Sequence, residues 1–268
     1  MARKLVALDL DDSLLDPDLQ ISPDCRQAIE QVRQRGVVVT ISTGRMYRSA
    51  RPYALQLGLE VPLITYEGAW VKNSCTEEVL YAKPVPGRLA REVMQFFKNA
   101  GVHFHSYFDD QLVMEALTPE GLAYGRLAGV EIQLREDLIA GLDSNEAMKI
   151  MAISRQEDEL VEMEQTLKNC YGERLHITRS KPHFLEVMHP EADKAKALQV
   201  IAGYYRLDRL EIMAVGDSYN DLEMIAWAGL GVAMGNAFPA VKARADFVTG
   251  SNTEAGVAQA LRRFILEA

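Results

Sequence analysis

Short apolar runs alternate with amphipathic stretches over much of this chain. Six of the runs are bounded by glycine, proline or acidic residues, as is typical of buried strands. They cover residues 4–10, 37–42, 62–65, 212–215, 230–233 and 246–248. Helical periodicity falls between them, over residues 23–35, 46–57, 194–205, 219–228 and 253–266. Repeated strand–helix order predicts an α/β fold, a doubly wound parallel sheet of the Rossmann-like kind with helices on both faces.

The middle of the chain has a different pattern. Helical stretches are predicted at 87–100, near 118–127 and at 157–170, and strand-like runs at 103–108, 111–115, 149–154, 175–178 and 184–188. This order predicts an inserted α+β domain with a mostly antiparallel sheet. Prolines at positions 84, 86 and 190 are plausible hinges because proline restricts its own backbone and that of its predecessor. We therefore predict a core of residues 1–82 and 189–268 and an inserted domain of residues 83–188.

Composition and charge narrow the class of protein. The chain has 268 residues, 48% hydrophobic and 25% charged, which suits one large globular domain or two smaller ones. A net charge of −9 disfavours binding to nucleic acid or to a membrane surface. No apolar run approaches the length of a membrane helix, and three cysteines at unrelated spacings favour reduced thiols. We expect a cytoplasmic protein.

Two carboxylates follow the first predicted strand. Asp9 and Asp11 lie at its carboxyl end, which is where open parallel sheets bind ligands. Side chains two residues apart in extended backbone point to the same side, so both acids can face one crevice while Leu10 turns into the core. Like charges this close favour a bound cation. Taken alone, the pattern is equally compatible with a solvated turn.

A second apolar strand also ends in acids. Asp217 lies just past the strand 212–215, and Asp221 would project from the first turn of the next helix toward the same side. Carboxylates at two neighbouring strand ends form a hard-oxygen site suited to Mg²⁺, which binds carboxylates, water and substrate phosphate. The sequence therefore favours a magnesium site over a solvated turn.

Phosphate-binding groups follow a third strand. Thr43 supplies a hydroxyl, Gly44 a backbone donor and Arg45 a guanidinium with phosphate-binding geometry. Lys194, at the start of a predicted helix, adds a point charge. Together with the acids, these groups predict phosphoryl transfer with a carboxylate nucleophile, a second carboxylate for proton transfer and a metal.

Four motifs in order along the chain resemble those of the haloacid dehalogenase-like phosphatases, in particular the Cof-type sugar-phosphatase branch with a large α/β cap. They are LDLDDSLL, ISTGR, the lysine of DKAKAL, and GDSYNDLEM. The segments GVAMGNA and ADFVTGSNTEAGVAQAL also resemble the end of that branch. The resemblance covers nearly the whole chain. It implies that the inserted domain is a mobile cap that would close over the site and contribute to substrate choice.

The resemblance also implies residue roles. Asp9 would attack phosphorus, and Asp11 would protonate the leaving group and then activate water. Thr43 and Lys194 would hold the phosphoryl oxygens. Mg²⁺ would be bound by Asp9, the backbone carbonyl of Asp11, Asp217 and, directly or through water, Asp221. Asn220 and Asn236 are further substrate-binding candidates, although Asn236 suits a turn after a glycine equally well.

One departure from the family pattern concerns substrate choice. Glu67 stands where this branch commonly has the asparagine of Asn-Gly-Ala. Either Glu67 pairs with Arg45 or with a cap arginine such as Arg88 or Arg91, or it meets the substrate directly.

These observations predict a Mg²⁺-dependent phosphatase that acts on a small phosphorylated metabolite, such as a sugar phosphate or a related cofactor, as a monomer or weak homo-oligomer. A phosphomutase or phosphotransferase of the same superfamily is an alternative. A catalytically idle phosphometabolite sensor is another, although it has no need of both a nucleophile and an acid.

Overall fold

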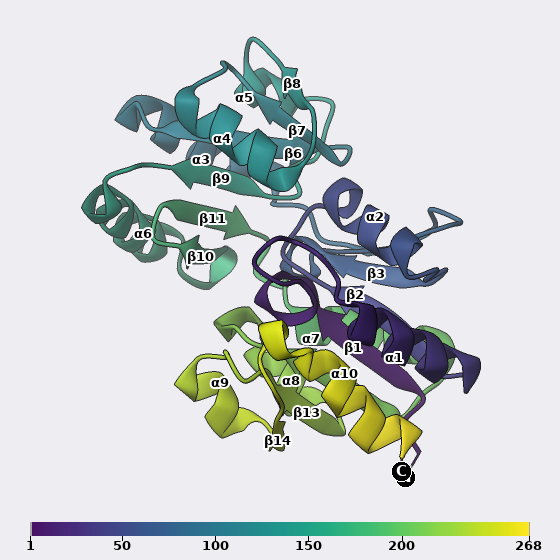
Figure 1. Cartoon of the computed structure of the whole chain (residues 1–268). Helices are drawn as coiled ribbons and strands as arrows, with labels where there is room; N and C mark the ends of the chain where they lie inside the picture. Colours follow the sequence, from purple (N-terminus) through teal and green to yellow (C-terminus); the bar gives the residue numbers. More distant parts are fainter. Residues whose placement is uncertain (1, 268) are drawn as a thin grey trace. The chain divides into compact units, whose positions relative to one another are not determined.

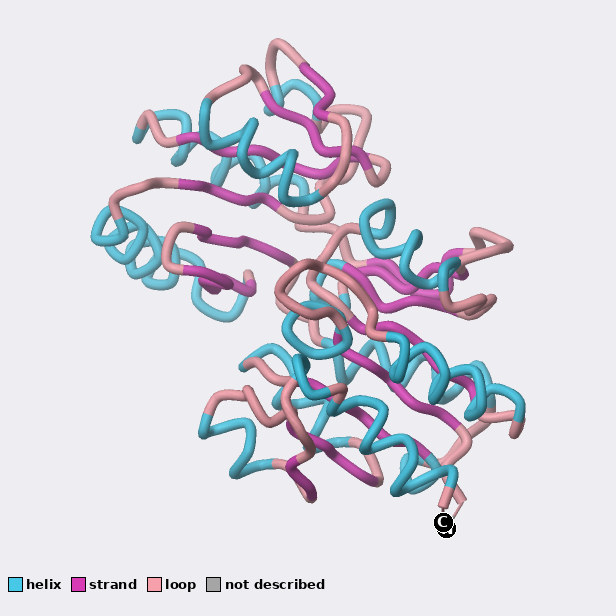
Figure 2. Tube along the Cα trace, viewed as in Figure 1, coloured by secondary structure: helices cyan, strands magenta, loops and turns pink. Residues whose placement is uncertain are grey.

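The computed structural model describes residues 2–267, which separate into two compact units. The core unit runs up to Tyr81 and resumes at Asp193, and the inserted unit is Ala82–Ala192. The sequence predicts an insert of residues 83–188, and the observed unit begins one residue earlier and ends four residues later. Each unit has its own sheet (Figure 2).

The core unit is built on an eight-stranded sheet in the order β14-β13-β12-β1-β2-β3-β4-β5. Its strands are β1 (Leu5–Asp9), β2 (Val38–Ser42), β3 (Pro62–Thr65), β4 (Trp70–Asn73), β5 (Val79–Ala82), β12 (Ile212–Gly216), β13 (Leu230–Ala233) and β14 (Phe247–Val248). Strand β1 is central and pairs in parallel with β12 and β2. The carboxyl ends of these three strands therefore lie at one edge of the sheet.

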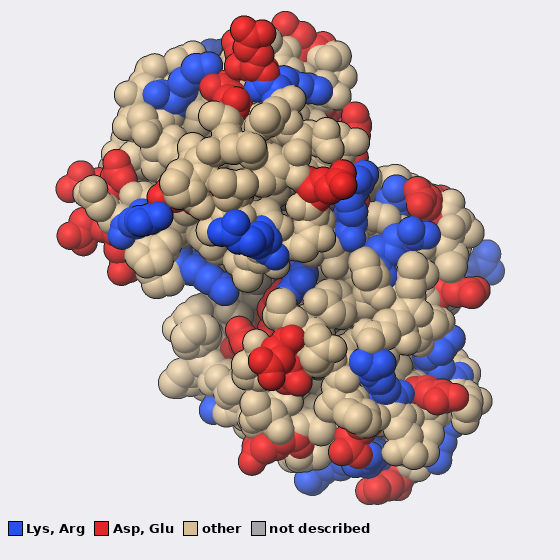
Figure 3. Space-filling model, turned by 45° about the horizontal axis from the view of Figure 1, so that its top comes forward, with Lys and Arg blue, Asp and Glu red and all other residues tan. Residues whose placement is uncertain are grey.

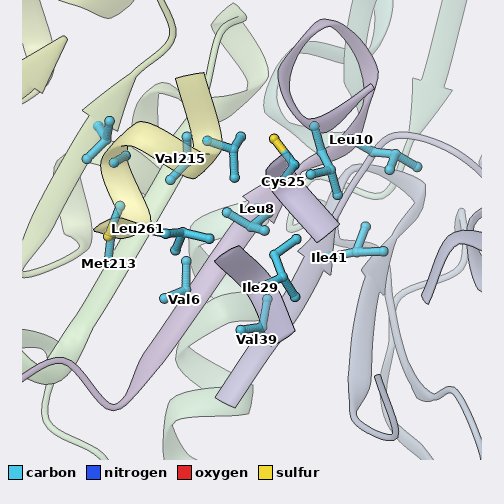
Figure 4. Packing of buried hydrophobic residues seen from close by; sticks show 14 of the residues in the cluster. Val6, Leu8, Leu10, Cys25, Ile29, Val39, Ile41, Met213, Val215 and Leu261 are labelled. Atoms are coloured by element: carbon cyan, nitrogen blue, oxygen red, sulfur yellow. The ribbon is translucent and has the colours of Figure 1, made fainter. Parts of the chain in front are cut away.

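Helices cover both faces of the core sheet (Figure 1). They are α1 (Pro23–Gln34), α2 (Tyr47–Gln56), α7 (Lys194–Tyr205), α8 (Leu222–Trp227), α9 (Pro239–Arg244) and α10 (Gly256–Leu261). Alternate residues of β1 point to opposite faces. Val6 and Leu8 pack with Ile29 of α1 and Leu261 of α10 (Figure 4). Leu5 and Ala7 pack with residues of α7 on the other face. The doubly wound α/β core is confirmed.

The inserted unit has a six-stranded sheet in the order β10-β11-β9-β6-β7-β8. Its strands are β6 (His103–Phe108), β7 (Gln111–Met114), β8 (Ile132–Leu134), β9 (Ile150–Ile153), β10 (His176–Lys181) and β11 (Phe184–Met188), and its helices are α3 (Gly87–Ala100), α4 (Pro119–Ala128), α5 (Leu138–Gly141) and α6 (Glu157–Tyr171). Only β7 and β8 pair in parallel among the pairings described. Helices α3 and α6 contribute to its apolar core, so the α+β architecture is confirmed.

Several short elements depart from the sequence prediction. Strands β4, β5 and β8 and helices α5 and α9 were not predicted; each has six residues or fewer. Strand β4 pairs antiparallel with β3, so the core sheet is not wholly parallel. An element this short contains at most two turns of helix or two strand repeats, too few for hydrophobic periodicity to identify it.

On the face drawn in Figure 3, basic and acidic side chains are interspersed, without a continuous basic surface. No helix among residues 2–267 combines the length and apolar character needed to cross a membrane.

Candidate active site

Three buried aspartates meet at the carboxyl ends of β1 and β12. Asp9 is the last residue of β1, Asp217 follows the last residue of β12, and Asp221 closes the short turn after it. One carboxylate oxygen from each lies within 4.8 Å of the others. The turn Leu10–Leu14 after β1 buries Leu10, as predicted. The structure therefore brings together acids from two motifs more than 200 residues apart.

Lys194 is the buried cation of this cluster. It begins α7, where the Asp193 side chain accepts hydrogen bonds from backbone N–H groups of the first turn. The Lys194 ammonium donates to Asp9 Oδ1 at 2.8 Å and to Asp221 Oδ1 at 2.7 Å. Burial lowers the pKa of this ammonium, but the charges of Asp221 and Asp9 outweigh burial and raise it well above its usual value. Lys194 therefore stays charged and partly neutralises the cluster.

The remaining carboxylate charge is only partly compensated. Burial, followed by the charges of Asp221 and Asp217, raises the pKa of Asp9 well above its usual value despite Lys194. Burial and Asp221 raise the pKa of Asp217 to about 7, against a hydrogen bond that Ser13 donates to Asp217 at 3.2 Å. A divalent cation would remove this repulsion, and three carboxylates are a donor set that suits Mg²⁺. The residues present thus fit a magnesium ion.

Asp221 is fixed by the backbone of its own loop. Its Oδ2 accepts hydrogen bonds from the N–H groups of Asp217 and Ser218, each at 3.1 Å. Gly216 makes room for it, because a Cβ at that glycine would lie 2.4 Å from the Asp221 carboxyl carbon. The carboxylate therefore faces the cluster without relying on Lys194 alone.

The loop after β2 carries the predicted phosphate-binding groups. Thr43 is buried, and its hydroxyl accepts a hydrogen bond from the Arg45 N–H at 3.1 Å. The Arg45 guanidinium binds both carboxylate oxygens of Asp11, at 2.8 and 2.6 Å, and lies over the Tyr53 ring. Asp11 is thus held by an arginine beside the cluster, an arrangement that the sequence did not reveal.

Glu67 lies in the short turn Tyr66–Gly68 that follows β3. Its Oε2 accepts a hydrogen bond from Asn220 at 2.8 Å. Arg45 binds Asp11, Arg88 binds Glu92 and Arg91 binds Asp143, and a pairing of Glu67 with one of these arginines stays a prediction. Glu67 is only 8% exposed, so it is a buried loop residue.

Two further contacts link the motif loops. Asn236 donates to the backbone oxygen of Asp12 at 2.7 Å and accepts from the N–H of Asn252 at 3.0 Å. Its amide thereby joins loops, and a contact with substrate stays a prediction. The sequence analysis missed Ser13 as a partner of Asp217; its position two residues after Asp11 in the first motif was the available signal.

Comparison with known proteins places the chain in a family. Residues 6–261 match the model of the haloacid dehalogenase-like hydrolases. The HMP-PP phosphatase of Serratia proteamaculans is 32% identical over 240 residues, which cover 89% of this chain and 86% of that protein. The 5-amino-6-(5-phospho-D-ribitylamino)uracil phosphatase YitU of Bacillus subtilis is 32% identical over 275 residues, 97% of each. A haloacid dehalogenase-like hydrolase from Bacteroides thetaiotaomicron has a TM-score of 0.90 at 29% identity, covering 97% of this chain and 99% of that one.

The chain therefore belongs to the haloacid dehalogenase-like hydrolases. Within that family it is a phosphatase, a hydrolase of phosphoric monoesters.

Proposed function

We propose that the protein hydrolyses a small phosphorylated metabolite with Mg²⁺ and through an aspartyl-phosphate intermediate. The observation that carries this proposal is the cluster of Asp9, Asp217 and Asp221 around the Lys194 ammonium. A buried nucleophile held beside one cation and two further carboxylates suits phosphoryl transfer, which depends on positioning and on neutralising charge.

The chemistry divides into two steps. A carboxylate oxygen of Asp9 attacks phosphorus, the bond to the leaving oxygen breaks, and Asp11 gives that oxygen a proton. Water then attacks the aspartyl phosphate, Asp11 takes the proton from water, and inorganic phosphate leaves as Asp9 is regenerated. Thr43, the Gly44 backbone and Lys194 hold the phosphoryl oxygens, and Arg45 orients Asp11.

Magnesium would neutralise charge on the phosphoryl oxygens and orient the substrate. Asp9, the backbone carbonyl of Asp11 and Asp217 would hold the ion, with Asp221 contributing directly or through water. Asp221 is already bonded to Lys194 and to two backbone N–H groups, which favours the indirect role.

The substrate class is proposed from the relatives. Their names specify HMP-PP and 5-amino-6-(5-phospho-D-ribitylamino)uracil, and we propose a small phosphorylated metabolite, such as a sugar phosphate or a related cofactor, for this chain. The inserted unit would act as the cap that selects the leaving group. We further propose that the enzyme acts in the cytoplasm as a monomer or weak homo-oligomer.

The decisive experiment is a screen of purified protein with Mg²⁺ against a panel of phosphorylated metabolites. Release of inorganic phosphate from at least one of them is expected, together with an acid-quenched phosphoryl adduct on the peptide that contains Asp9. Adding an acceptor alcohol tests the rival transferase: transfer to the alcohol in preference to water would establish it. Binding of metabolites without any turnover would establish the sensor.

A further inference from the structure

The Glu67 carboxylate lies among the groups assigned above to phosphate binding. Its Oε2 accepts a hydrogen bond from Asn220 at 2.8 Å. Its Oε1 occupies the space left by the missing side chain of Gly44, since a Cβ there would lie 1.8 Å from that oxygen. Its charge, with those of Asp221 and Asp9, also opposes the effect of burial on the pKa of Lys194 and raises it. Glu67 therefore lies against Gly44, one of the three proposed phosphate ligands, and its charge acts on a second, Lys194.

The backbone that carries Glu67 is fastened to the phosphate-binding loop. The Tyr66 N–H donates to the carbonyl of Arg45 at 2.9 Å, and the Glu67 N–H donates to the carbonyl of Thr43 at 3.2 Å. Tyr66 and Glu67 are both buried with φ of 51° and 54°. Non-glycine residues adopt this left-handed conformation only where the surrounding structure holds them there. The loop thus fixes the position of the carboxylate.

Charge in this region is strongly negative. Glu67 adds a fourth buried carboxylate to the three clustered aspartates, among which Lys194 is buried as a cation. The guanidinium of Arg45 already binds Asp11. Repulsion between charges is strong where water is scarce. A phosphate dianion entering this region therefore meets one more negative charge than it would beside the asparagine common in the family branch.

We propose that Glu67 is a specificity-determining residue that weakens the binding of phosphate dianions. The enzyme thereby favours monophosphate esters whose leaving group carries no further anionic charge, and it releases inorganic phosphate readily. This inference rests on the proposed function, because it takes Thr43, Gly44 and Lys194 as the phosphate ligands. A second phosphate on the substrate would add to the repulsion, whereas a neutral or amino leaving group would not.

Calorimetric titration of inorganic phosphate in the presence of Mg²⁺ tests directly whether the charge of Glu67 weakens phosphate binding. Glu67→Gln removes the charge and keeps a side-chain oxygen that can accept the hydrogen bond from Asn220. Its Kd for inorganic phosphate is expected to fall at least tenfold, equivalent to about 1.4 kcal/mol. Glu78→Gln is the matched control, since Glu78 is exposed in the same unit and the change in net charge is identical; its Kd is expected to stay that of the wild type.

A purely structural role for Glu67 predicts another outcome. If the residue only tied its loop to Asn220, Glu67→Gln would bind phosphate as the wild type does and Glu67→Ala would bind it more weakly. The proposal expects tighter binding in both variants. A Kd for Glu67→Gln within twofold of the wild-type value overturns the proposal. Glu67→Asn is a second neutral variant with the same expected gain if Glu67→Gln does not fold.

Substrate ranking provides an independent measurement. The ratio of kcat/KM for a hexose bisphosphate to that for the corresponding hexose monophosphate should rise at least tenfold in Glu67→Gln; an unchanged ratio contradicts the selection against a second phosphate. These measurements also distinguish failure of the proposed function from failure of this inference. Wild-type protein that neither turns over esters nor binds phosphate overturns both proposals, whereas wild-type turnover with an unchanged Glu67→Gln overturns only this one.

Discussion

At the scale of single residues, the site buries charged groups that would each be unfavourable alone, and these charges partly compensate one another. Asp9 is buried beside two other carboxylates, an arrangement that favours its neutral form. Lys194 offsets part of this charge with two hydrogen bonds of 2.7 and 2.8 Å. The proposed role of Asp9 as a nucleophile needs its ionised form, so a bound metal would add to the charge compensation that Lys194 provides. The proposed activity therefore requires an ionised Asp9, whereas the stability of the metal-free protein favours a neutral one.

The variant Asp9→Asn tests whether turnover and stability respond in opposite directions. We expect at least a thousandfold loss of phosphatase turnover, about 4 kcal/mol of barrier, because the amide cannot form the covalent intermediate. The metal-free free energy of unfolding should be unchanged or higher, because one repelling carboxylate is gone. Turnover assays measure the first quantity, and urea denaturation in the presence of EDTA measures the metal-free free energy of unfolding. Residual activity above about a tenth of wild type, or a stability loss above about 1 kcal/mol, would contradict this account.

His105 in β6 gives a residue-scale prediction in the inserted unit. It is fully buried and hydrogen-bonded to His103 and Tyr107 at 3.2 Å each, with Tyr124 and Lys149 close by. Burial, then the charges of His103 and Lys149, lower its pKa well below the usual value. The folded form therefore resists a proton that the unfolded chain accepts.

The sign of the resulting pH dependence follows from linkage. Below about pH 6.5 the unfolded state binds more protons, so the folded state loses up to about 1.4 kcal/mol per pH unit from this group as the pH falls. His105→Gln should show a shallower loss of unfolding free energy between pH 7 and pH 5 than the wild type, whatever its absolute stability. Parallel pH profiles of the two proteins would refute the buried neutral histidine.

At the scale of elements, the loops after β2 and β3 and the start of α7 are packed backbone to backbone. Gly68 shows how close they come: its φ is 91°, and a Cβ there would lie 2.3 Å from the carbonyl oxygen of Asp193. Asp193 caps the helix that begins with Lys194. The glycine therefore sets the distance between the Glu67 loop and the lysine.

Gly68→Ala should lower the free energy of unfolding by about 3 kcal/mol or more, since backbone strain and a backbone clash add. Gly36→Ala is the matched control: Gly36 has φ of 79° in the same unit, but nothing lies within 4 Å of the added Cβ. We expect about 1 kcal/mol for it. Chemical denaturation measures both, and equal losses would show that the close approach to Asp193 does not matter.

Predictability from sequence also differs between elements. The long amphipathic period of α3 allowed its bounds to be predicted as residues 87–100, as observed. Strand β8 has three residues with two exposed, a pattern without any period. The acids at the ends of β1 and β12 could be placed together because parallel strands share one carboxyl edge. The partners of Arg45 and Glu67 could not, because several groups of suitable charge lie within reach and only tertiary packing selects among them.

At the scale of the whole molecule, the residues proposed for catalysis all belong to one of the two units. Every residue of the aspartate cluster, Lys194 and the Thr43–Arg45 loop belongs to the core unit, although these residues come from both ends of the chain. The sequence motifs identified that unit and its family because four of them, each with a chemically distinctive residue, occur in a fixed order along the chain. Residues of the insert that would contact a leaving group carry no such motif, so sequence alone did not name them.

The last prediction concerns Mg²⁺ and global stability. Mg²⁺ should bind the folded core and not the unfolded chain, and it should relieve repulsion among the three aspartates. Thermal melts should therefore shift upward with Mg²⁺ concentration, by the equivalent of about 2.7 kcal/mol at a hundred times Kd. Asp217→Asn should lose most of that shift. Asp18→Asn, which removes an exposed carboxylate of the same unit, should keep it. Melts that superimpose with EDTA and with millimolar Mg²⁺, together with activity indifferent to EDTA, would exclude the magnesium site.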